Sequence, residues 1–187
     1  MTTKHLYLLL IVALLGIGEC FAQRNIITPV PWECEWGDKT LPLEKPLNLY
    51  FADKIENRES LIKELRDMGI AFKEVRRPAR KNCINFGPGE GAWNSLEAYT
   101  LAITEEGITI DACGEAGYYY ALQSLKQICA EYGVSGELPE CHIYDIPRFD
   151  YRGVLIDISR HFRSVEFLKR QIDVMASLKM NRLHLHL

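Results

Sequence analysis

The sequence lacks a strong charge of either sign. Its 187 residues include 25 acidic and 22 basic side chains, which gives a formal net charge of −3. A nucleic-acid-binding protein needs a basic patch to neutralise phosphates, so this balance argues against that class. The chain has no internal repeat and no low-complexity segment. With 48% hydrophobic residues, 13 glycines and 8 prolines, its composition is close to the globular average and excludes wholesale disorder, collagen and coiled coil.

The sequence also lacks an apolar run of the ~20 residues that a membrane-spanning helix requires. Its longest apolar run, Leu6–Ile17, lies near the start and is followed by small and polar residues and then by Cys20-Phe21-Ala22. This is the layout of a secretory signal peptide, with an uncleaved anchor as the alternative. We predict cleavage after Ala22, so that residues 1–22 are removed and the protein is exported to the periplasm or beyond the cell. Lipoprotein processing at Cys20 is disfavoured because Glu19 fits a lipidation site poorly.

The six cysteines form no C-x-x-C pair, which argues against a zinc or redox site. Removal of residues 1–22 leaves an odd number of them. The apolar content makes a framework of several disulfides unnecessary, although a single disulfide is possible. Cys83, Cys113 and Cys129 lie in apolar-patterned segments, where buried thiols are expected.

Residues 23–148 are predicted to form an α+β domain. Alternating apolar residues predict strands, and apolar residues at helical spacing predict helices. The expected strands cover residues 47–51, 71–75, 83–86, 99–104 and 108–110, and the expected helices cover residues 58–68 and 115–132. Asn57 is the expected N-cap of the first helix, and Gly69 and Gly133 are expected to end the two helices. The result is a mostly antiparallel sheet covered by helices.

Residues 133–148 contain two prolines and are predicted to be a loop, in which we place a domain boundary. The apolar run 154–158 that follows is typical of a strand buried on both faces. Ser164 can cap a helix, and residues 181–187 form a second strand, which a right-handed crossover makes parallel to the first. Residues 149–187 are therefore predicted to be the first βαβ unit of an incomplete TIM (β/α)8 barrel.

Polar side chains cluster after the first of these two strands. Asp157, Arg160 and His161 lie where barrel enzymes place the side chains that contact ligands. An arginine presents a fork of donors that can hold vicinal hydroxyls or a carboxylate. The alternative is a structural ion pair that stabilises this end of the barrel. Spacing alone does not favour ligand binding over the ion pair.

His184 and His186 alternate along the second strand, so both imidazoles lie on one face. Such a pair can contribute to a metal site, but two ligands do not make one. Hydrogen-bonded interior histidines are the preferred interpretation. The loop Gly87–Gly91 lacks the Lys and Ser/Thr of a phosphate-binding loop, and the run Tyr118–Tyr120 is predicted to pack against the sheet rather than to bind sugar.

Longer stretches resemble glycoside hydrolase family 20, the β-N-acetylhexosaminidases. Residues 145–162, which end in the motif Asp157-Ile-Ser-Arg-His-Phe162, and residues 172–187 resemble the opening of that family's catalytic barrel. Residues 27–31, 97–101 and 117–128 are similar, less specifically, to its N-terminal α+β domain. The resemblance covers nearly all of the chain that remains after residues 1–22 are removed.

This resemblance implies an exo-β-N-acetylhexosaminidase that releases terminal non-reducing N-acetylhexosamine from oligosaccharides or glycans. In the family the substrate's own acetamido oxygen attacks the anomeric carbon, a glutamate protonates the leaving oxygen and an aspartate orients the acetamido group. No metal or organic cofactor is implied. Arg160 is implied to bind ring hydroxyls of the sugar, and supporting roles fall to Asp157, His161, His184 and His186.

The family's Asp-Glu pair lies several strands further on than Leu187. We therefore assign no catalytic residue and expect the 187 residues by themselves to be inactive. Three alternatives stay open: another glycosidase or a glucuronidase with a similar small domain, a metal-dependent barrel hydrolase that uses His184 and His186, and a non-catalytic scaffold or glycan-binding module.

Overall fold

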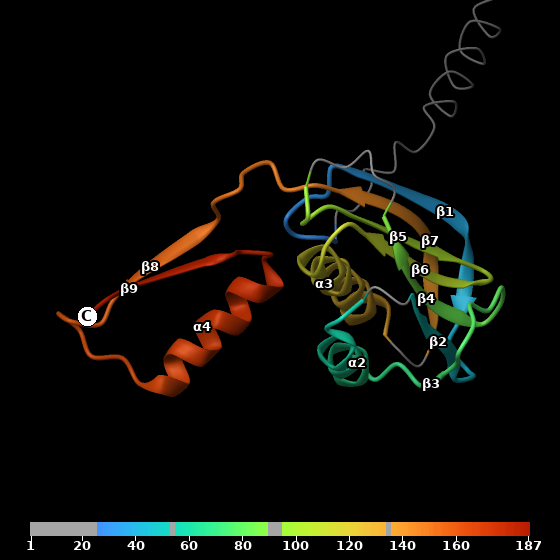
Figure 1. Cartoon of the computed structure of the whole chain (residues 1–187), viewed down its shortest axis with the longest axis horizontal. Coiled ribbons are helices and arrows are strands. Elements are labelled where there is room, and N and C mark those ends of the chain that lie inside the picture. The colour runs from blue at the N-terminus through green and yellow to red at the C-terminus, as the bar shows by residue number, and fades with distance from the viewer. Residues whose placement is uncertain (1–25, 53–54, 90–94, 134–135) are drawn as a thin grey trace, which may run out of the picture.

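A computed structural model describes residues 26–52, 55–89, 95–133 and 136–187. The predicted signal peptide and the end of the Gly87–Gly91 loop lie outside these residues. The described chain has two parts that lie side by side (Figure 1). We call the first part, which ends at residue 145, the sheet layer, because it contains the larger sheet and two helices. The second part, which begins at residue 153, is the βαβ unit, with two strands and one helix.

The sheet layer is built on one sheet of seven strands in the order β1-β7-β5-β6-β4-β2-β3. Its strands are β1 (Glu33–Pro42), β2 (Leu47–Phe51), β3 (Phe72–Glu74), β4 (Cys83–Pro88), β5 (Tyr99–Thr104), β6 (Gly107–Ala112) and β7 (Glu137–Asp145). The predicted hairpin is confirmed, because β5 and β6 pair antiparallel with Leu101 opposite Ile110. Both of these side chains are fully buried, whereas Thr100 and Ala102 face the other side of the sheet and are partly exposed.

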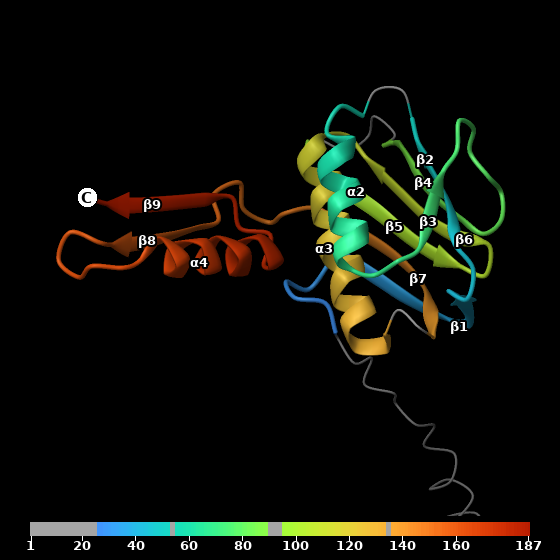
Figure 2. The ribbon, with the colours of Figure 1, turned by 90° about the horizontal axis from the view of Figure 1, so that it is seen from below.

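Two helices, α2 (Arg58–Asp67) and α3 (Glu115–Tyr132), cover one face of this sheet. They lie between the sheet and the βαβ unit (Figure 2). The tyrosine run packs as predicted: Tyr118 and Tyr120 are buried, and Tyr118 donates a hydrogen bond of 2.8 Å to the Gly87 carbonyl. Gly133 ends α3 with a φ of 83°, a conformation that glycine adopts without steric cost.

The prediction of a loop over residues 133–148 is wrong for most of that range, because strand β7 occupies Glu137–Asp145. This strand lies between β1 and β5 in the sheet. Pro139 suggested a loop, but it lies beyond the last β5 partner, Cys141, and so removes no hydrogen bond from that ladder. Asp145 also interrupts the apolar alternation by which a strand is recognised, since it places a carboxylate at a buried position. Strand β1 was also missed. It is an edge strand whose apolar alternation covers Cys34 and Trp36 and then stops at the polar residues 37–40, and Leu41 alone is buried.

The α+β fold class is confirmed, with a sheet that is mixed rather than mostly antiparallel. The pairs β1–β7, β7–β5 and β5–β6 are antiparallel, whereas β6–β4, β4–β2 and β2–β3 are parallel. The parallel β2–β3 pair follows from the crossover through α2. Asn57 precedes α2 as predicted, but its side chain makes no capping hydrogen bond.

The βαβ unit agrees with the prediction. It consists of β8 (Gly153–Asp157), α4 (Val165–Ser177) and β9 (Arg182–His186), and the two strands are parallel. Ser164 caps α4 by accepting a hydrogen bond of 3.2 Å from the Phe167 backbone N–H. Both strands run away from the sheet layer (Figure 2). They are not buried on both faces in the described chain, since the Leu155 side chain of β8 is exposed.

No two of the five cysteines in the described residues form a disulfide. Cys83 and Cys129 are buried as predicted, whereas Cys113 is partly exposed. In the same part of the chain, none of the helices combines the length and apolarity needed to span a bilayer.

Candidate functional site

The carboxyl ends of β8 and β9 bring three of the predicted site residues together. Asp157 ends β8, and its Oδ1 accepts hydrogen bonds from the backbone N–H groups of Ser159 (3.0 Å) and Arg160 (2.9 Å). Arg160 Nε lies 3.5 Å from Asp157 Oδ2, while the arginine side chain is 78% exposed. Asp157 therefore orders the turn after β8 and leaves most of the guanidinium donors available to a ligand.

His186 completes this cluster from the neighbouring strand. It is the register partner of Asp157, and its Nδ1 lies 3.3 Å from Asp157 Oδ2. The backbone N–H of Arg160 is the largest cause that holds the pKa of Asp157 below its ordinary value, and the contacts with His186 and Ser159 add to it. Asp157 is thus an ionised acceptor for the turn and for His186, and Arg160 is the most exposed member of the cluster.

The other two predicted residues do not join this cluster. His184 lies on the same face of β9 as His186, as the alternation predicts, and its register partner is Leu155. Both His184 and His161 are exposed, and neither side chain makes a hydrogen bond within the described residues. That part of the chain also contains no group of three or more His, Cys, Asp or Glu side chains spaced to hold a metal ion. The metal-site hypothesis therefore gains no support there.

A second polar cluster, which sequence reasoning missed, lies at the opposite end of these strands. Lys179 precedes β9 and is buried, with 4% of its surface exposed. Its Nζ donates hydrogen bonds of 2.7 Å to Asp145 Oδ2 and to the Tyr99 hydroxyl, which in turn lies 2.7 Å from Ser124 Oγ. Lys179 has a φ of 56°, a left-handed conformation that is costly for lysine and persists where surrounding contacts hold it.

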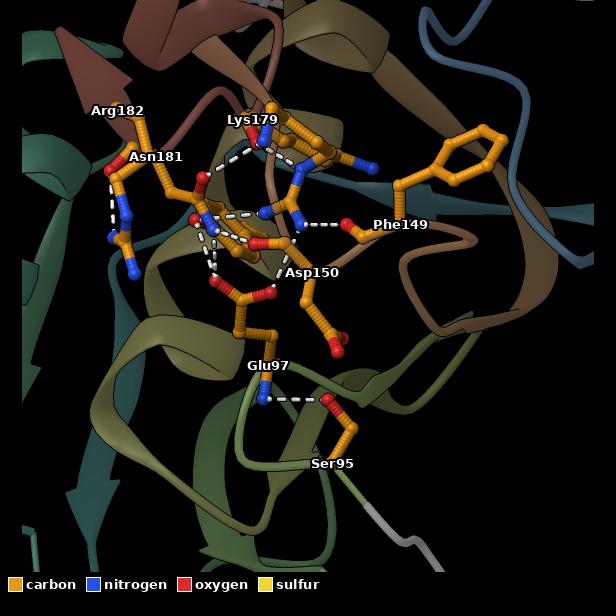
Figure 3. A network of polar contacts seen from close by, with 9 residues as sticks. Ser95, Glu97, Phe149, Asp150, Lys179, Asn181 and Arg182 are labelled. Carbon is orange, nitrogen blue, oxygen red and sulfur yellow. Dashed lines mark hydrogen bonds and ion pairs between the residues drawn. The ribbon is translucent and has the colours of Figure 1, made fainter. Parts of the chain in front are cut away.

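Glu97 gathers a neighbouring set of contacts (Figure 3). Its Oε2 accepts a hydrogen bond of 3.0 Å from Arg152 Nη1, and its Oε1 accepts one of 3.0 Å from Asn181 Nδ2. The Tyr120 hydroxyl donates to the same Oε1 over 3.2 Å. We call this second polar cluster the seam, since it joins the sheet layer to the βαβ unit; its members are Glu97, Tyr99, Tyr120, Asp145, Arg152, Lys179 and Asn181.

Burial and pairing compete for the charges of the seam. Partial burial disfavours the Glu97 carboxylate, but the hydrogen bonds from Arg152 and Asn181 outweigh it and lower the pKa of Glu97. For Lys179 the balance is reversed: burial lowers its pKa, and Asp145 compensates only in part. A cavity of about 380 Å³ opens beside these groups, walled by Trp32 and Phe149. It lies at the starts of β8 and β9, away from Arg160.

Weak signals for the seam were present in the sequence. Leu138, Cys141, Ile143 and Asp145 occupy the buried positions of β7, so a charge stands where an apolar residue is expected. A buried carboxylate needs a partner, and Lys179 supplies it from 34 positions away along the chain. Neither local pattern nor spacing can identify such a partner.

Comparison with known proteins assigns a family to both parts of the chain. The family model described as glycosyl hydrolase family 20, domain 2, matches residues 24–146. The model of the same family's catalytic domain matches residues 149–187.

The curated proteins that the chain resembles are named as β-hexosaminidases or chitobiases. A β-hexosaminidase of Porphyromonas gingivalis is 33% identical over 150 residues, which is 76% of this chain and 18% of that protein. An N,N'-diacetylchitobiase of Vibrio harveyi is 44% identical over 90 residues, which is 48% of this chain and 10% of that protein. The chain thus spans less than a fifth of the length of either relative.

Solved structures agree with this assignment. The β-N-acetylhexosaminidase of Bacteroides fragilis superposes with a TM-score of 0.75 at 28% identity, over 87% of this chain and 33% of that one. The exo-β-N-acetylglucosaminidase of Vibrio harveyi, solved with N-acetylglucosamine, superposes with a TM-score of 0.72 at 29% identity, over 87% of this chain and 25% of that one. By its sequence over both parts and by its fold, the chain belongs to glycosyl hydrolase family 20.

Proposed function

We propose that this protein acts as an exported exo-β-N-acetylhexosaminidase, which releases terminal non-reducing N-acetylhexosamine residues. The observation that carries the proposal is the family match over both the sheet layer and the βαβ unit. The names of the relatives, β-hexosaminidase and chitobiase, support the activity and the class of substrate. Export rests on the signal-peptide pattern of residues 1–22.

Arg160 is the residue that we propose to contact the sugar. Its guanidinium is exposed beside the carboxyl end of β8, which is the end at which barrel enzymes bind ligands. Asp157 holds the preceding turn through the Arg160 backbone N–H and leaves the side chain to reach outward. A planar fork of donors suits the vicinal hydroxyls of a pyranose ring. Asp157 and His186 then act as supports of Arg160, and His161 and His184 as neighbours of the pocket.

The proposed chemistry is substrate-assisted hydrolysis with retention. The acetamido oxygen of the substrate attacks the anomeric carbon, a glutamate protonates the departing glycosidic oxygen, and water then opens the resulting ring. The family's Asp-Glu pair is not among residues 149–187, which supply one wall of the sugar site. We therefore propose that the 187 residues alone do not hydrolyse glycosides, and that no metal or organic cofactor takes part.

The test is an assay with 4-nitrophenyl N-acetyl-β-D-glucosaminide on two proteins. The first is the 187-residue chain, and the second is the same chain fused to the remaining barrel of the Bacteroides fragilis relative. We expect hydrolysis by the fusion alone. Arg160→Ala in the fusion is expected to lower kcat/KM about 10- to 150-fold, since a hydrogen bond to a charged group contributes roughly 1.5–3 kcal/mol.

Arg160→Lys serves as the matched variant, because it keeps the charge and loses the planar fork. If the fork matters, Arg160→Lys falls between wild type and Arg160→Ala. A folded fusion that hydrolyses no N-acetylhexosaminide would refute the proposed activity. Hydrolysis by the 187 residues alone would refute their proposed inactivity.

A further inference from the structure

The strands that carry the proposed sugar contact begin at the seam. Arg152 stands immediately before β8 and Asn181 immediately before β9, whereas Asp157 and His186 stand at their far ends. At a rise of about 3.3 Å per residue, roughly 16 Å separate Arg152 from Asp157. The two polar clusters therefore lie at opposite ends of the same pair of strands.

One carboxylate of the sheet layer holds both strand starts. Glu97 uses one oxygen for Arg152 and the other for Asn181, each over 3.0 Å. The two strand starts also hold each other, because the Arg152 backbone N–H donates to Asn181 Oδ1 (3.0 Å) and the Asn181 backbone N–H donates to the Arg152 carbonyl (2.8 Å). Glu97, Arg152 and Asn181 thus form a closed ring of hydrogen bonds.

The remaining hydrogen bonds of Arg152 fix the orientation of its guanidinium group. Nε donates to the Lys179 carbonyl over 2.8 Å, Nη2 to the Tyr120 hydroxyl over 3.1 Å and Nη1 also to the Phe149 carbonyl over 2.7 Å. The side chains of Arg152 and Glu97 are only 15% and 21% exposed, so water competes poorly for these bonds. A guanidinium with all of these directions fixed permits one orientation of β8 against the sheet layer.

The contacts between the two parts are concentrated at this end. The hydrogen bonds that join them come from Arg152, Ser177, Lys179 and Asn181, all of which lie at strand starts or at the end of α4. Strand β8 beyond the seam is poorly covered within the described residues, as Leu155 shows with 60% exposure. The far ends of β8 and β9 therefore follow whatever orientation the seam imposes.

We propose that Glu97 is a positioning residue for the sugar-binding end of the barrel. It sets the orientation of β8 and β9 relative to the sheet layer, and through these strands it sets the place of Asp157 and Arg160. A rotation of about 5° at the seam displaces Asp157 by roughly 1.4 Å over a lever of roughly 16 Å. A misplacement of ~1 Å in an active site can lower a rate ~100-fold. The effect of Glu97 on sugar binding rests on the proposed function, whereas its effect on the orientation of β8 and β9 does not.

The test measures that geometry in the 187-residue chain. Residual dipolar couplings of backbone amides give the orientation of β8 and β9 relative to β5, β6 and β7. We expect one alignment frame to fit both parts in wild type and to fail in Glu97→Ala, with a rotation of a few degrees or more.

The matched control is Glu105→Ala, which removes a sheet-layer carboxylate whose 2.9 Å ion pair with Lys39 lies more than half exposed. It should leave the couplings unchanged. If Glu97→Ala does not fold, Asn181→Ala serves in its place, because it removes the hydrogen bond to Glu97 Oε1 and the one from the Arg152 backbone N–H. A folded variant that loses stability but keeps the wild-type couplings would overturn the proposal, because Glu97 would then only stabilise. Neither outcome depends on hydrolysis, so the proposed activity stands or falls separately.

Discussion

The sheet layer and the βαβ unit bury their apolar side chains to very different extents. Strands β2, β4, β5 and β6 place an unbroken set of apolar side chains beneath α2 and α3, and Leu49, Ile84, Leu101 and Ile110 are all 0% exposed. Among the described residues of the βαβ unit, Met175 is the one buried apolar residue. Leu155, Ile172 and Val174 of the same unit are exposed. The sheet layer has its own core, but the βαβ unit depends on what it contacts.

The difference explains why the two parts meet through charges. An apolar interface would suffice to join them, yet the seam uses two ion pairs, Lys179–Asp145 and Arg152–Glu97. Buried ion pairs add little net stability, but they penalise every arrangement in which one partner is left alone. The seam therefore selects one relative orientation, which a nonspecific apolar contact would not do. Three predictions test this contrast.

The largest loss of stability is expected for Lys179→Met. The change leaves the buried Asp145 carboxylate without its cation, and breaking a buried pair on one side costs about 3–5 kcal/mol. Urea unfolding followed by circular dichroism measures the difference. Lys39→Met is the control, because it removes the exposed Lys39–Glu105 pair and should cost no more than ~1 kcal/mol. Similar losses in both variants would show that the seam is no more than a surface contact.

The next effect compares one substitution in the two parts. Leu101→Ala removes a side chain that is 0% exposed and should destabilise by about 2–5 kcal/mol. Leu155→Ala removes the same atoms where 60% of the residue is exposed, and should change stability by less than ~1 kcal/mol. Thermal unfolding of both variants provides the measurement. A large cost for Leu155→Ala would mean that β8 is buried in solution, for example against a second copy of the chain.

The smallest effect concerns helix caps. Ser164→Ala removes the hydrogen bond to the Phe167 N–H and should destabilise α4 by about 1 kcal/mol. Asn57→Ala should cost less than ~0.5 kcal/mol, because the Asn57 side chain makes no capping bond to α2. Amide hydrogen exchange in the first turn of each helix distinguishes the two. If Asn57→Ala accelerated exchange in α2 more than Ser164→Ala accelerated it in α4, Asn57 rather than Ser164 would be the stabilising cap.

The caps also show how far the sequence could predict the structure. Position and residue type located both helix starts, but only Ser164 forms the bond, since a cap also needs the right backbone conformation. The strands with buried alternation, such as β5 and β6, were predictable because each side chain reports its own environment. Strand β7 was not, because Asp145 fits its buried position only through Lys179.

The same reasoning separates the two polar clusters. Asp157 and Arg160 are three residues apart and lie at a strand end, so their proximity follows from local geometry, and His186 follows from strand pairing. Glu97 and Arg152 are 55 positions apart, and neither residue type nor spacing predicts that they meet. Only the folded chain shows that one carboxylate holds both strand starts.

The strand edges of the two parts differ in a way that bears on self-association. The sheet layer ends in β1, which has an irregular register between Trp36 and Thr40 and ends at Pro42, and in β3, which has three residues. Irregular, short and charged edges resist the addition of foreign strands. Strands β8 and β9 pair with each other alone among the described residues, so each presents a regular row of open backbone donors and acceptors. Open edges of this kind are places at which a further strand can pair.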